Sequence, residues 1–310
     1  RMLAMAASRL SYRVVTFDPD PNAPASQVAN AHNVSEYSDS GALRTFADQC
    51  DVVTYEFENV PVSAARTLEA LRPVHPRSSA LEVAQDRVSE KGFLNDIGVQ
   101  TAPYRAVDRL QELVDALAEF GGSGVLKTRR FGYDGKGQAA LKDASPGEVA
   151  AAFAALGGKA LILEGFVPFV AEISVIAARG QDGRVEAYDP VRNVHRHGIL
   201  WTSTVPAGVP SATGHRALEI AEQILVALDY VGVIGVEFFV LSEGSLLVNE
   251  IAPRVHNSGH WTEAACVVSQ FEQHIRAIAD LPLGDPARHS DCVMENLIGF
   301  EVELLPDLLR

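Results

Sequence analysis

Two apolar segments on either side of the turn at residues 242–245 constrain the fold of this chain most strongly. The Ser-Glu-Gly-Ser turn favours a β-hairpin. A register that places Leu241 opposite Leu246 also places Glu237 opposite Glu250. Like charges at opposite positions destabilise a strand pair by up to about 1 kcal/mol. The hairpin therefore needs something that compensates for two facing carboxylates.

The pair Glu237 and Glu250 predicts a magnesium site. Mg²⁺ takes oxygen ligands and is usually shared between one or two carboxylates, water molecules and substrate phosphates. Two alternatives remain, a solvated strand face and a pair in which one glutamate is protonated. The apolar neighbours argue against an exposed face.

A glycine-rich loop, FGYDGKGQ at residues 131–138, is expected between strands at 125–129 and 138–141. Glycines let backbone N–H groups approach a phosphate closely, and Lys136 adds a cation. It is not a Walker A loop, because a glycine and a strand follow the lysine. The alternative is a mobile hairpin tip. Lys127 in the preceding strand favours the phosphate site, because a lysine within a strand needs an anionic partner.

The segment at residues 252–261, APRVHNSGHW, places several hydrogen-bond donors in one turn. Arg254, His256 and Asn257 could hold a planar oxyanion such as bicarbonate or carboxyphosphate. His256 and His260 have the spacing of a helical zinc pair, but the Asn-Ser-Gly between them disfavours a helix. The alternative is that these histidines only cap and pack.

Weaker signals come from two other places. His195 lies in a basic loop, RNVHRH, which favours phosphate contact or a solvated turn. Glu56 and Glu58 follow an expected strand at 51–57, at the edge where open α/β sheets bind ligands.

Composition limits the class of protein. The chain has 310 residues and a net charge of −14, which disfavours binding to nucleic acid. It has no apolar run of the roughly 20 residues that cross a bilayer, and residues 1–7 suggest a buried helix, not a signal peptide. Cys50, Cys266 and Cys292 are too few and too scattered for a disulfide framework. These features favour a cytoplasmic protein that binds small molecules.

The pattern along the chain predicts α/β and α+β units in three domains. Residues 1–76 read as a parallel α/β unit that lacks its first strand. Residues 77–162 read as a linker helix followed by a small α+β flap, and residues 163–310 as a larger antiparallel sheet domain. Helices are expected at 42–50, 61–71, 80–97, 109–120, 146–156, 212–228 and 269–280, and further strands at 13–17, 170–178, 184–188, 231–241 and 246–251. Gly98 is expected to stop the helix at 80–97 as a C-cap glycine, and Ser145 and Glu148 are expected to form a capping box that opens the helix at 146–156.

These motifs resemble the ATP-grasp superfamily. Within it, QDRVSEK, FGYDGKGQ, RNVHRHGIL and NEIAPRVHNSGHW are similar to the 5-(carboxyamino)imidazole ribonucleotide synthase family of purine biosynthesis. The resemblance implies an ATP-grasp fold with a Rossmann-like preATP-grasp domain, a flap subdomain and a larger C-terminal subdomain. It also implies ATP- and Mg²⁺-dependent carboxylation of aminoimidazole ribonucleotide with bicarbonate, by a homodimer.

The resemblance further implies a role for each matching residue. Glu237 and Glu250 would bind magnesium, Arg254, His256 and Asn257 would hold bicarbonate, and Glu56, Tyr133 and Asp134 would meet the imidazole ribonucleotide. The ATP-binding residues would be Arg87, Lys127, Gly132, Tyr133, Asp134, Gly135, Lys136, Gly137, Gln138, Glu164, Gly165, Phe166, Val167, Glu172, His195, Asn249 and Glu250.

Members of this family normally begin with a strand and a Gly-Gln-Leu-Gly turn, and they continue into a basic C-terminal segment. Both are expected to be missing from this chain. Three other functions remain as alternatives: a formate-dependent glycinamide ribonucleotide transformylase, a biotin carboxylase, and an ATP-grasp module that binds ATP without turnover.

Overall fold

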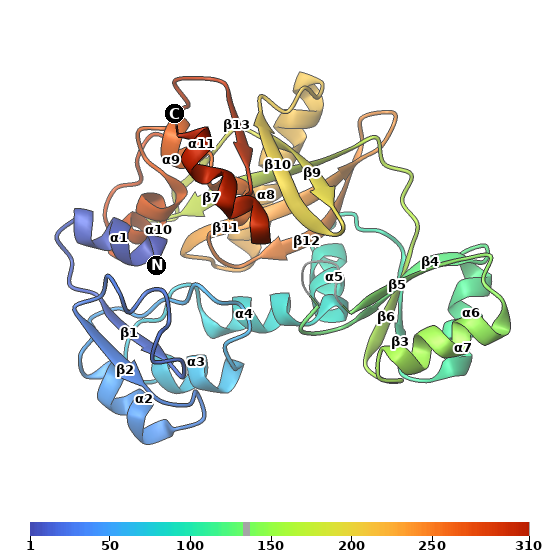
Figure 1. Ribbon diagram of the computed structural model, residues 1–310, viewed down its shortest axis with the longest axis horizontal. Coiled ribbons are helices and arrows are strands. Elements are labelled where there is room, and N and C mark those ends of the chain that lie inside the picture. Colours follow the sequence, from blue (N-terminus) through green and yellow to red (C-terminus); the bar gives the residue numbers. More distant parts are fainter. Residues whose placement is uncertain (133–136, 310) are drawn as a thin grey trace.

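The computed structural model describes residues 1–132 and 137–309, which form three β-sheets with helices around them (Figure 1). A two-stranded parallel sheet lies in the N-terminal unit. A four-stranded sheet has the order β3-β6-β4-β5. A seven-stranded sheet has the order β12-β11-β7-β9-β10-β13, with β8 paired to β7. The Rossmann-like N-terminal unit, the flap and the larger antiparallel sheet of the expected architecture are thus all present.

In the N-terminal unit, β1 (Val15–Asp18) pairs in parallel with β2 (Ala31–Val34). The helices α2 (Ser40–Ala47) and α3 (Val62–Glu69) pack beside it around Leu43 and other apolar side chains. The sequence signals did not predict β2.

The strand expected at 51–57 is wrong. Only Val53 forms a bridge, to Val74, and the backbone then leaves the extended conformation. The segment it would pair with contains Pro73 and Pro76, which have no N–H to donate. A longer ladder therefore does not form.

The helix expected at 80–97 is also wrong as a single element. It is divided into α4 (Ser78–Gln85) and α5 (Arg87–Asp96), because Asp86 has φ −123° and its carboxylate accepts hydrogen bonds from Val88 N (3.0 Å) and Ser89 N (3.3 Å). Asp86 is thus an N-cap inside the apolar pattern. The expected stop at Gly98 is confirmed by its φ of +79°.

The flap consists of β3 (Tyr104–Val107), β4 (Ser123–Thr128), β5 (Gln138–Lys142) and β6 (Leu161–Gly165), packed against α6 (Leu110–Glu119) and α7 (Pro146–Ala155). The expected capping box is confirmed, since Ser145 N donates to Glu148 Oε2 at 2.8 Å and Glu148 N donates to Ser145 Oγ at 3.4 Å. β6 lies across the boundary expected between residues 162 and 163, and it pairs with β3 and β4.

The central strands of the seven-stranded sheet are buried on both faces. Its strands are β7 (Ala171–Arg179), β8 (Val185–Ala187), β9 (Val191–Arg196), β10 (Ile199–Val205), β11 (Gly232–Val240), β12 (Leu246–Ala252) and β13 (Cys292–Glu295). On β7, Ile173 packs towards α8 (Ser211–Ala227), and Ile176 packs towards α10 (Gln270–Ile278) and the N-terminal helix α1 (Met2–Arg9). This two-sided burial explains the nearly continuous apolar sequence of β7.

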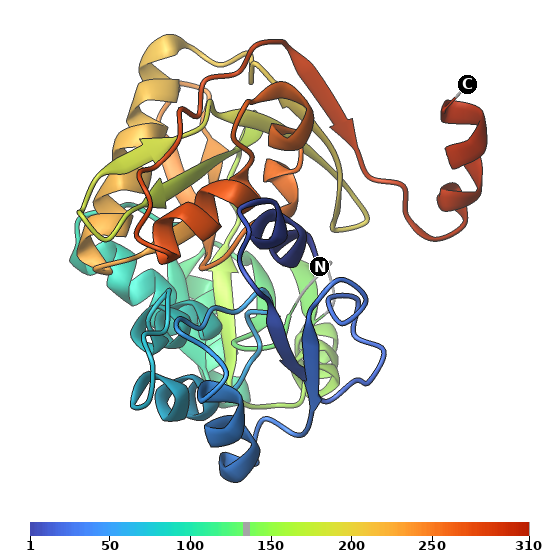
Figure 2. The ribbon, with the colours of Figure 1, turned by 90° about the vertical axis from the view of Figure 1, so that its left-hand side faces the viewer.

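The remaining elements are short. They are η1 (Asn257–Gly259), α9 (Thr262–Ala265), η2 (Gly299–Leu304) and α11 (Leu305–Leu308). Figure 2 shows η2 and α11 extending away from the rest of the molecule after β13. Within residues 1–132 and 137–309, no helix combines the length and apolar character needed to span a bilayer.

Candidate active site

The hairpin of β11 and β12 places Glu237 directly opposite Glu250, as the sequence predicted. The predicted register at the turn is wrong by one residue. Val240, not Leu241, faces Leu246, because the backbone of Leu241 closes the turn instead of continuing the ladder.

A β-bulge at Asn249 restores the pairing of the two glutamates. Phe238 pairs with Val248, so Asn249 is the extra residue before Glu250. Asn249 Nδ2 donates to Glu237 Oε2 at 3.4 Å, and the buried Asn249 Oδ1 has no hydrogen-bond partner among residues 1–132 and 137–309. The bulge thus adds a third oxygen-bearing side chain to the same wall.

The helix α5 holds Glu250 through three residues on one of its faces. Arg87 Nη1 lies 3.0 Å from Glu250 Oε2. The carboxylate of Glu90 accepts a hydrogen bond at 2.5 Å from the backbone N–H that follows Glu250, and Lys91 Nζ donates at 3.1 Å to the carbonyl that precedes it. The spacing i, i+3, i+4 places all three on one face. The sequence signals pointed to Arg87 but missed Glu90 and Lys91.

The facing carboxylates have opposite pKa shifts. Burial and the nearby charge of Glu250 raise the pKa of Glu237 to about 7. Burial also acts to raise the pKa of Glu250, but the cations of Arg87 and Lys127 outweigh it and lower that pKa to about 2. Without a bound cation, Glu250 is therefore charged near neutral pH, and Glu237 is only partly ionised.

The oxygens of Glu237, Asn249 and Glu250 fit the ligand preference of Mg²⁺. The orphaned Asn249 Oδ1 offers a free lone pair, and the raised pKa of Glu237 reflects negative charge that a cation there would compensate. No group of three or more His, Cys, Asp or Glu side chains with metal-site geometry occurs in the described parts of the chain. Mg²⁺ needs fewer protein ligands than that, because water and phosphate complete its octahedron.

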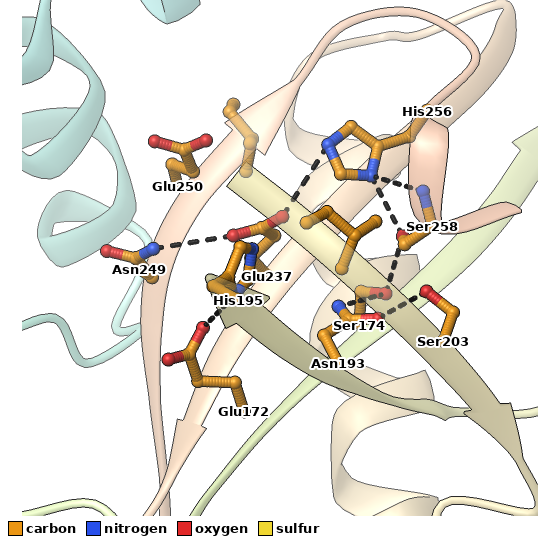
Figure 3. A network of polar contacts seen from close by, with 12 residues as sticks. Glu172, Ser174, Asn193, His195, Ser203, Glu237, Asn249, Glu250, His256 and Ser258 are labelled. Atoms are coloured by element: carbon orange, nitrogen blue, oxygen red, sulfur yellow. Dashed lines mark hydrogen bonds and ion pairs between the residues drawn. The ribbon is translucent and has the colours of Figure 1, made fainter. Parts of the chain in front are cut away.

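Arg254 and His256 lie beside the glutamates. Arg254 Nε and Nη2 are both 2.9 Å from Glu58 Oε2, and His256 Nε2 is 3.5 Å from Glu237 Oε1 (Figure 3). Burial and the charge of Arg254 lower the pKa of His256 to about 3, so its ring is neutral. Of the two candidate glutamates from the N-terminal unit, Glu58 lines this cavity, whereas Glu56 pairs elsewhere, with the amino group of Arg1.

His260 is not brought into a metal pair with His256. A 3₁₀ turn, η1, lies between the two histidines, and the His260 ring packs 5.5 Å from that of Phe271. The sequence argument that Asn-Ser-Gly disfavours an α-helix between the two histidines is confirmed.

The anionic partner of Lys127 is a protein group. Lys127 Nζ lies 2.9 Å from Glu164 Oε2, and the buried Lys91 Nζ lies 3.5 Å from Glu164 Oε1. The expected anionic partner is therefore present as a carboxylate, and the contact of Lys127 with a phosphate stays a prediction. The partner lies 37 residues away on β6, and nothing local in the sequence indicates it.

The facing glutamates line a cavity of about 400 Å³ together with the cations and the histidine beside them. On one wall, His195 Nδ1 lies 2.7 Å from Glu172 Oε2, and the rings of Phe169 and Phe239 stack 4.7 Å apart. The lining residues are Glu58, Arg87, Lys127, Gly132, Gln138, Phe169, Glu172, His195, Gly198, Leu200, Glu237, Phe239, Asn249, Glu250, Arg254, His256 and Asn257. The sequence reasoning missed the two phenylalanines, since an apolar side chain that lines a cavity has the same pattern as one that lines a core.

The other candidates lie apart from this lining. Glu164 and Gly165 end β6, Phe166 and Val167 follow it, and Gly137 precedes β5. The candidates Tyr133, Asp134, Gly135 and Lys136 lie outside the described residues.

Comparison with known proteins agrees with this architecture. The ribonucleotide synthetase preATP-grasp domain matches residues 1–85, and the ATP-grasp domain matches residues 92–271. The N5-carboxyaminoimidazole ribonucleotide synthase of Brucella melitensis is 57% identical over 309 residues, which cover 100% of this chain and 85% of the relative.

Two solved structures are also similar. The N5-carboxyaminoimidazole ribonucleotide synthetase of Thermus thermophilus superposes with a TM-score of 0.90 and 48% identity, over 96% of this chain and 80% of that one. The N5-carboxyaminoimidazole synthase of Aspergillus clavatus, solved with ADP and 5-aminoimidazole ribonucleotide, has a TM-score of 0.91 and 30% identity, over 100% and 83%. The chain belongs to the N5-carboxyaminoimidazole ribonucleotide synthase family of the ATP-grasp superfamily.

Proposed function

We propose that this protein is an ATP-dependent ligase that carboxylates 5-aminoimidazole ribonucleotide with bicarbonate. The observation that carries the proposal is one cavity in which the facing pair Glu237 and Glu250 meets Arg254 and His256. Carboxylates that fit Mg²⁺ and donors that fit an oxyanion lie on the same wall. A phosphoryl group and bicarbonate could therefore meet there.

In the proposed reaction, a bicarbonate oxygen attacks the γ-phosphorus of ATP, and ADP leaves. The exocyclic amine of the ribonucleotide then attacks the carboxyl carbon of carboxyphosphate. A C–N bond forms, the C–O bond to phosphate breaks, and the amine loses a proton. Mg²⁺, when bound, neutralises charge on the transferring phosphoryl group.

The side chains of this chain would orient and stabilise these groups. We assign Arg87 and Lys127 to the phosphates, and Glu172 with His195 to the ribose side of the nucleotide, because all four line the cavity. Arg254, the neutral His256 and Asn257 would hold the bicarbonate oxygens. The Arg254 guanidinium must then exchange part of its contact with Glu58 for the incoming anion. The ADP and ribonucleotide complex of the Aspergillus clavatus relative supports a shared site for both substrates.

We also propose a cytoplasmic homodimer that binds neither nucleic acid nor membrane. The net charge of −14 disfavours a polyanion, and the cysteines Cys50, Cys266 and Cys292 are free thiols, as in a reducing compartment. Light scattering of the purified chain tests the dimer.

The decisive assay supplies isotopically labelled bicarbonate or labelled formate together with ATP, Mg²⁺ and aminoimidazole ribonucleotide. We expect label from bicarbonate in the product and ATP hydrolysis that needs both bicarbonate and the ribonucleotide. Incorporation from formate alone would show a transformylase. ATP binding without turnover under any of these conditions would show a nucleotide-binding module.

A further inference from the structure

Four buried polar side chains, three on the seven-stranded sheet and one on η1, connect to His256. Ser174, Ser203 and Ser258 are fully buried, and Asn193 is 5% exposed. Buried polar groups are costly unless each finds a partner. Here each side chain is hydrogen-bonded to the next. The four form a hydrogen-bonded file that runs from Ser203 on β10 through Asn193 on β9 and Ser174 on β7 to Ser258 on η1 (Figure 3).

The strand register places the side chains of the file at neighbouring positions. Asn193 lies opposite Ser203 on β10, and Ser174 lies opposite Glu237 on β11. Along the same face of β7, Ile176 belongs to the apolar core and Glu172 lines the cavity. Ser174 thus stands between the core and the cavity, where a polar side chain can connect the two.

Each hydroxyl or amide group of the file donates to one acceptor. Ser203 Oγ donates to Asn193 Oδ1 (2.9 Å), Asn193 Nδ2 donates to Ser174 Oγ (3.0 Å), and Ser174 Oγ donates to Ser258 Oγ (2.7 Å). Ser258 Oγ lies 2.8 Å from His256 Nδ1. Since the Ser258 oxygen already accepts from Ser174, its own proton is free to point at the imidazole.

A backbone group fixes the direction of this last bond. The Ser258 N–H also points at His256 Nδ1, at 3.3 Å, which requires a lone pair on that nitrogen. The imidazole proton must then be on Nε2, the nitrogen that faces the cavity. At 3.5 Å from Glu237 Oε1, this Nε2–H is too distant for a good hydrogen bond and is available to another acceptor.

Further contacts fix the backbone of His256 and the position of its side chain against β11. Gln270, which is fully buried, accepts from the His256 N–H at 2.9 Å and donates to its carbonyl at 2.7 Å. A Cβ at Gly235 would come within 2.8 Å of the His256 Cβ and 3.0 Å of its Cγ, so only glycine lets the side chain lie this close to β11.

We propose that Ser258, Ser174, Asn193 and Ser203 are positioning residues that keep the proton of His256 on Nε2, so that this histidine offers a hydrogen-bond donor to an oxyanion in the cavity. The oxyanion of the proposed function is bicarbonate or the carboxyphosphate formed from it, and the kinetic part of the proposal rests on that function. The four residues do not touch the substrate themselves.

The first test is spectroscopic and uses the full chain labelled with [¹⁵N]histidine. We expect the long-range ¹H–¹⁵N pattern of an imidazole protonated on Nε2, assigned among the nine histidines by its loss in His256→Gln. The pattern of an Nδ1-protonated ring in the wild type would overturn the proposal, whatever the enzyme does with bicarbonate.

The second test compares Ser258→Ala and Ser174→Ala with the control Ser78→Ala, a buried serine that bonds Glu69 away from the cavity. Loss of one hydrogen bond corresponds to a fall of about tenfold in kcat/KM for bicarbonate. We expect this fall in both variants of the file, with the KM for ATP within about twofold of wild type, and no such fall in the control. Ser258→Thr, which keeps a hydroxyl, should recover part of the loss.

Lower thermal stability in the two variants of the file with an unchanged kcat/KM for bicarbonate would overturn the proposal, because it would show a purely structural network. Absence of bicarbonate-dependent turnover in the wild type would instead refute the proposed function, and the histidine spectrum would still decide the position of the proton.

Discussion

The buried carboxylates of the two larger sheets have opposite kinds of charged neighbours. On the four-stranded sheet, Glu164 is 3% exposed and lies between the ammonium groups of Lys91 and Lys127. Burial acts to raise its pKa, but the two lysines outweigh it and lower the pKa. On the seven-stranded sheet, Glu237 and Glu250 face each other, and their pKa values move apart.

The difference separates a structural cluster from a binding site. Glu164 has two cationic partners, so its negative charge is compensated by the protein when the chain folds. Within the described part of the chain, the facing pair has one directly bonded cation, Arg87, for two carboxylates. A buried charge without full compensation is costly, and a bound cation can supply the remainder. We expect substitution of Glu164 to affect mainly stability, and substitution of Glu237 or Glu250 to affect mainly catalysis.

The largest expected effect is on catalysis. Glu250→Gln should lower bicarbonate incorporation by roughly 1,000-fold or more, because it removes a cation ligand and the partner of Arg87. Circular dichroism and the thermal midpoint should show that the fold persists. Glu243→Gln, in the exposed turn of the same hairpin, is the matched control and should keep wild-type activity. Undiminished activity of Glu250→Gln would dismiss the magnesium assignment.

The next effect is on stability. Glu164→Gln should lower the free energy of unfolding by about 3 kcal/mol, because it removes the carboxylate that pairs with two lysines, one of them fully buried. Urea denaturation measures this change. Glu119→Gln, which breaks the exposed ion pair with Arg105, should cost less than about 1 kcal/mol. Equal losses in the two variants would show that the buried Glu164 cluster stabilises the fold no more than an exposed ion pair does.

The smallest effect is the release of protons when Mg²⁺ and nucleotide bind. In the free protein the pKa of Glu237 is about 7, so this carboxyl is roughly half protonated at pH 7, and a cation beside it drives the proton off. We expect a release of about half a proton at pH 7, rising towards one at pH 6. Calorimetry in two buffers of different ionisation enthalpy measures it, and Glu237→Gln should lack this contribution.

The raised pKa of Glu237 also makes the stability of the folded protein depend on pH. The folded pKa of Glu237 lies above its ordinary value of 4.5. Its stabilising contribution is therefore complete below about pH 4.5 and is lost as the pH rises through 7. Mg²⁺ with nucleotide should stabilise the protein more at pH 8 than at pH 6. The opposite order would show that this glutamate does not meet the cation.

The sequence predicted the parts of the site that depend on near neighbours. The pairing of Glu237 with Glu250, the capping box at Ser145 and the stop at Gly98 follow from turn chemistry and from the two- and 3.6-residue periods. Even here a local detail decided the geometry, because the bulge at Asn249 compensates for a turn that closes one residue earlier than expected. The matching motifs also indicated Arg87, Glu172 and His195, which all line the cavity.

What the sequence alone determined is which chemical groups this chain carries and how the strand pair that bears two of them is built. Only the tertiary structure decided which group neutralises which. Lys127 pairs with Glu164, and Arg254 pairs with Glu58. His256 contacts Ser258, whose hydroxyl oxygen accepts a hydrogen bond from Ser174 on β7. These partners are distant in sequence, and strand period and turn type do not encode the choice between one carboxylate and another. The packing of the two larger sheets and α5 around one cavity does.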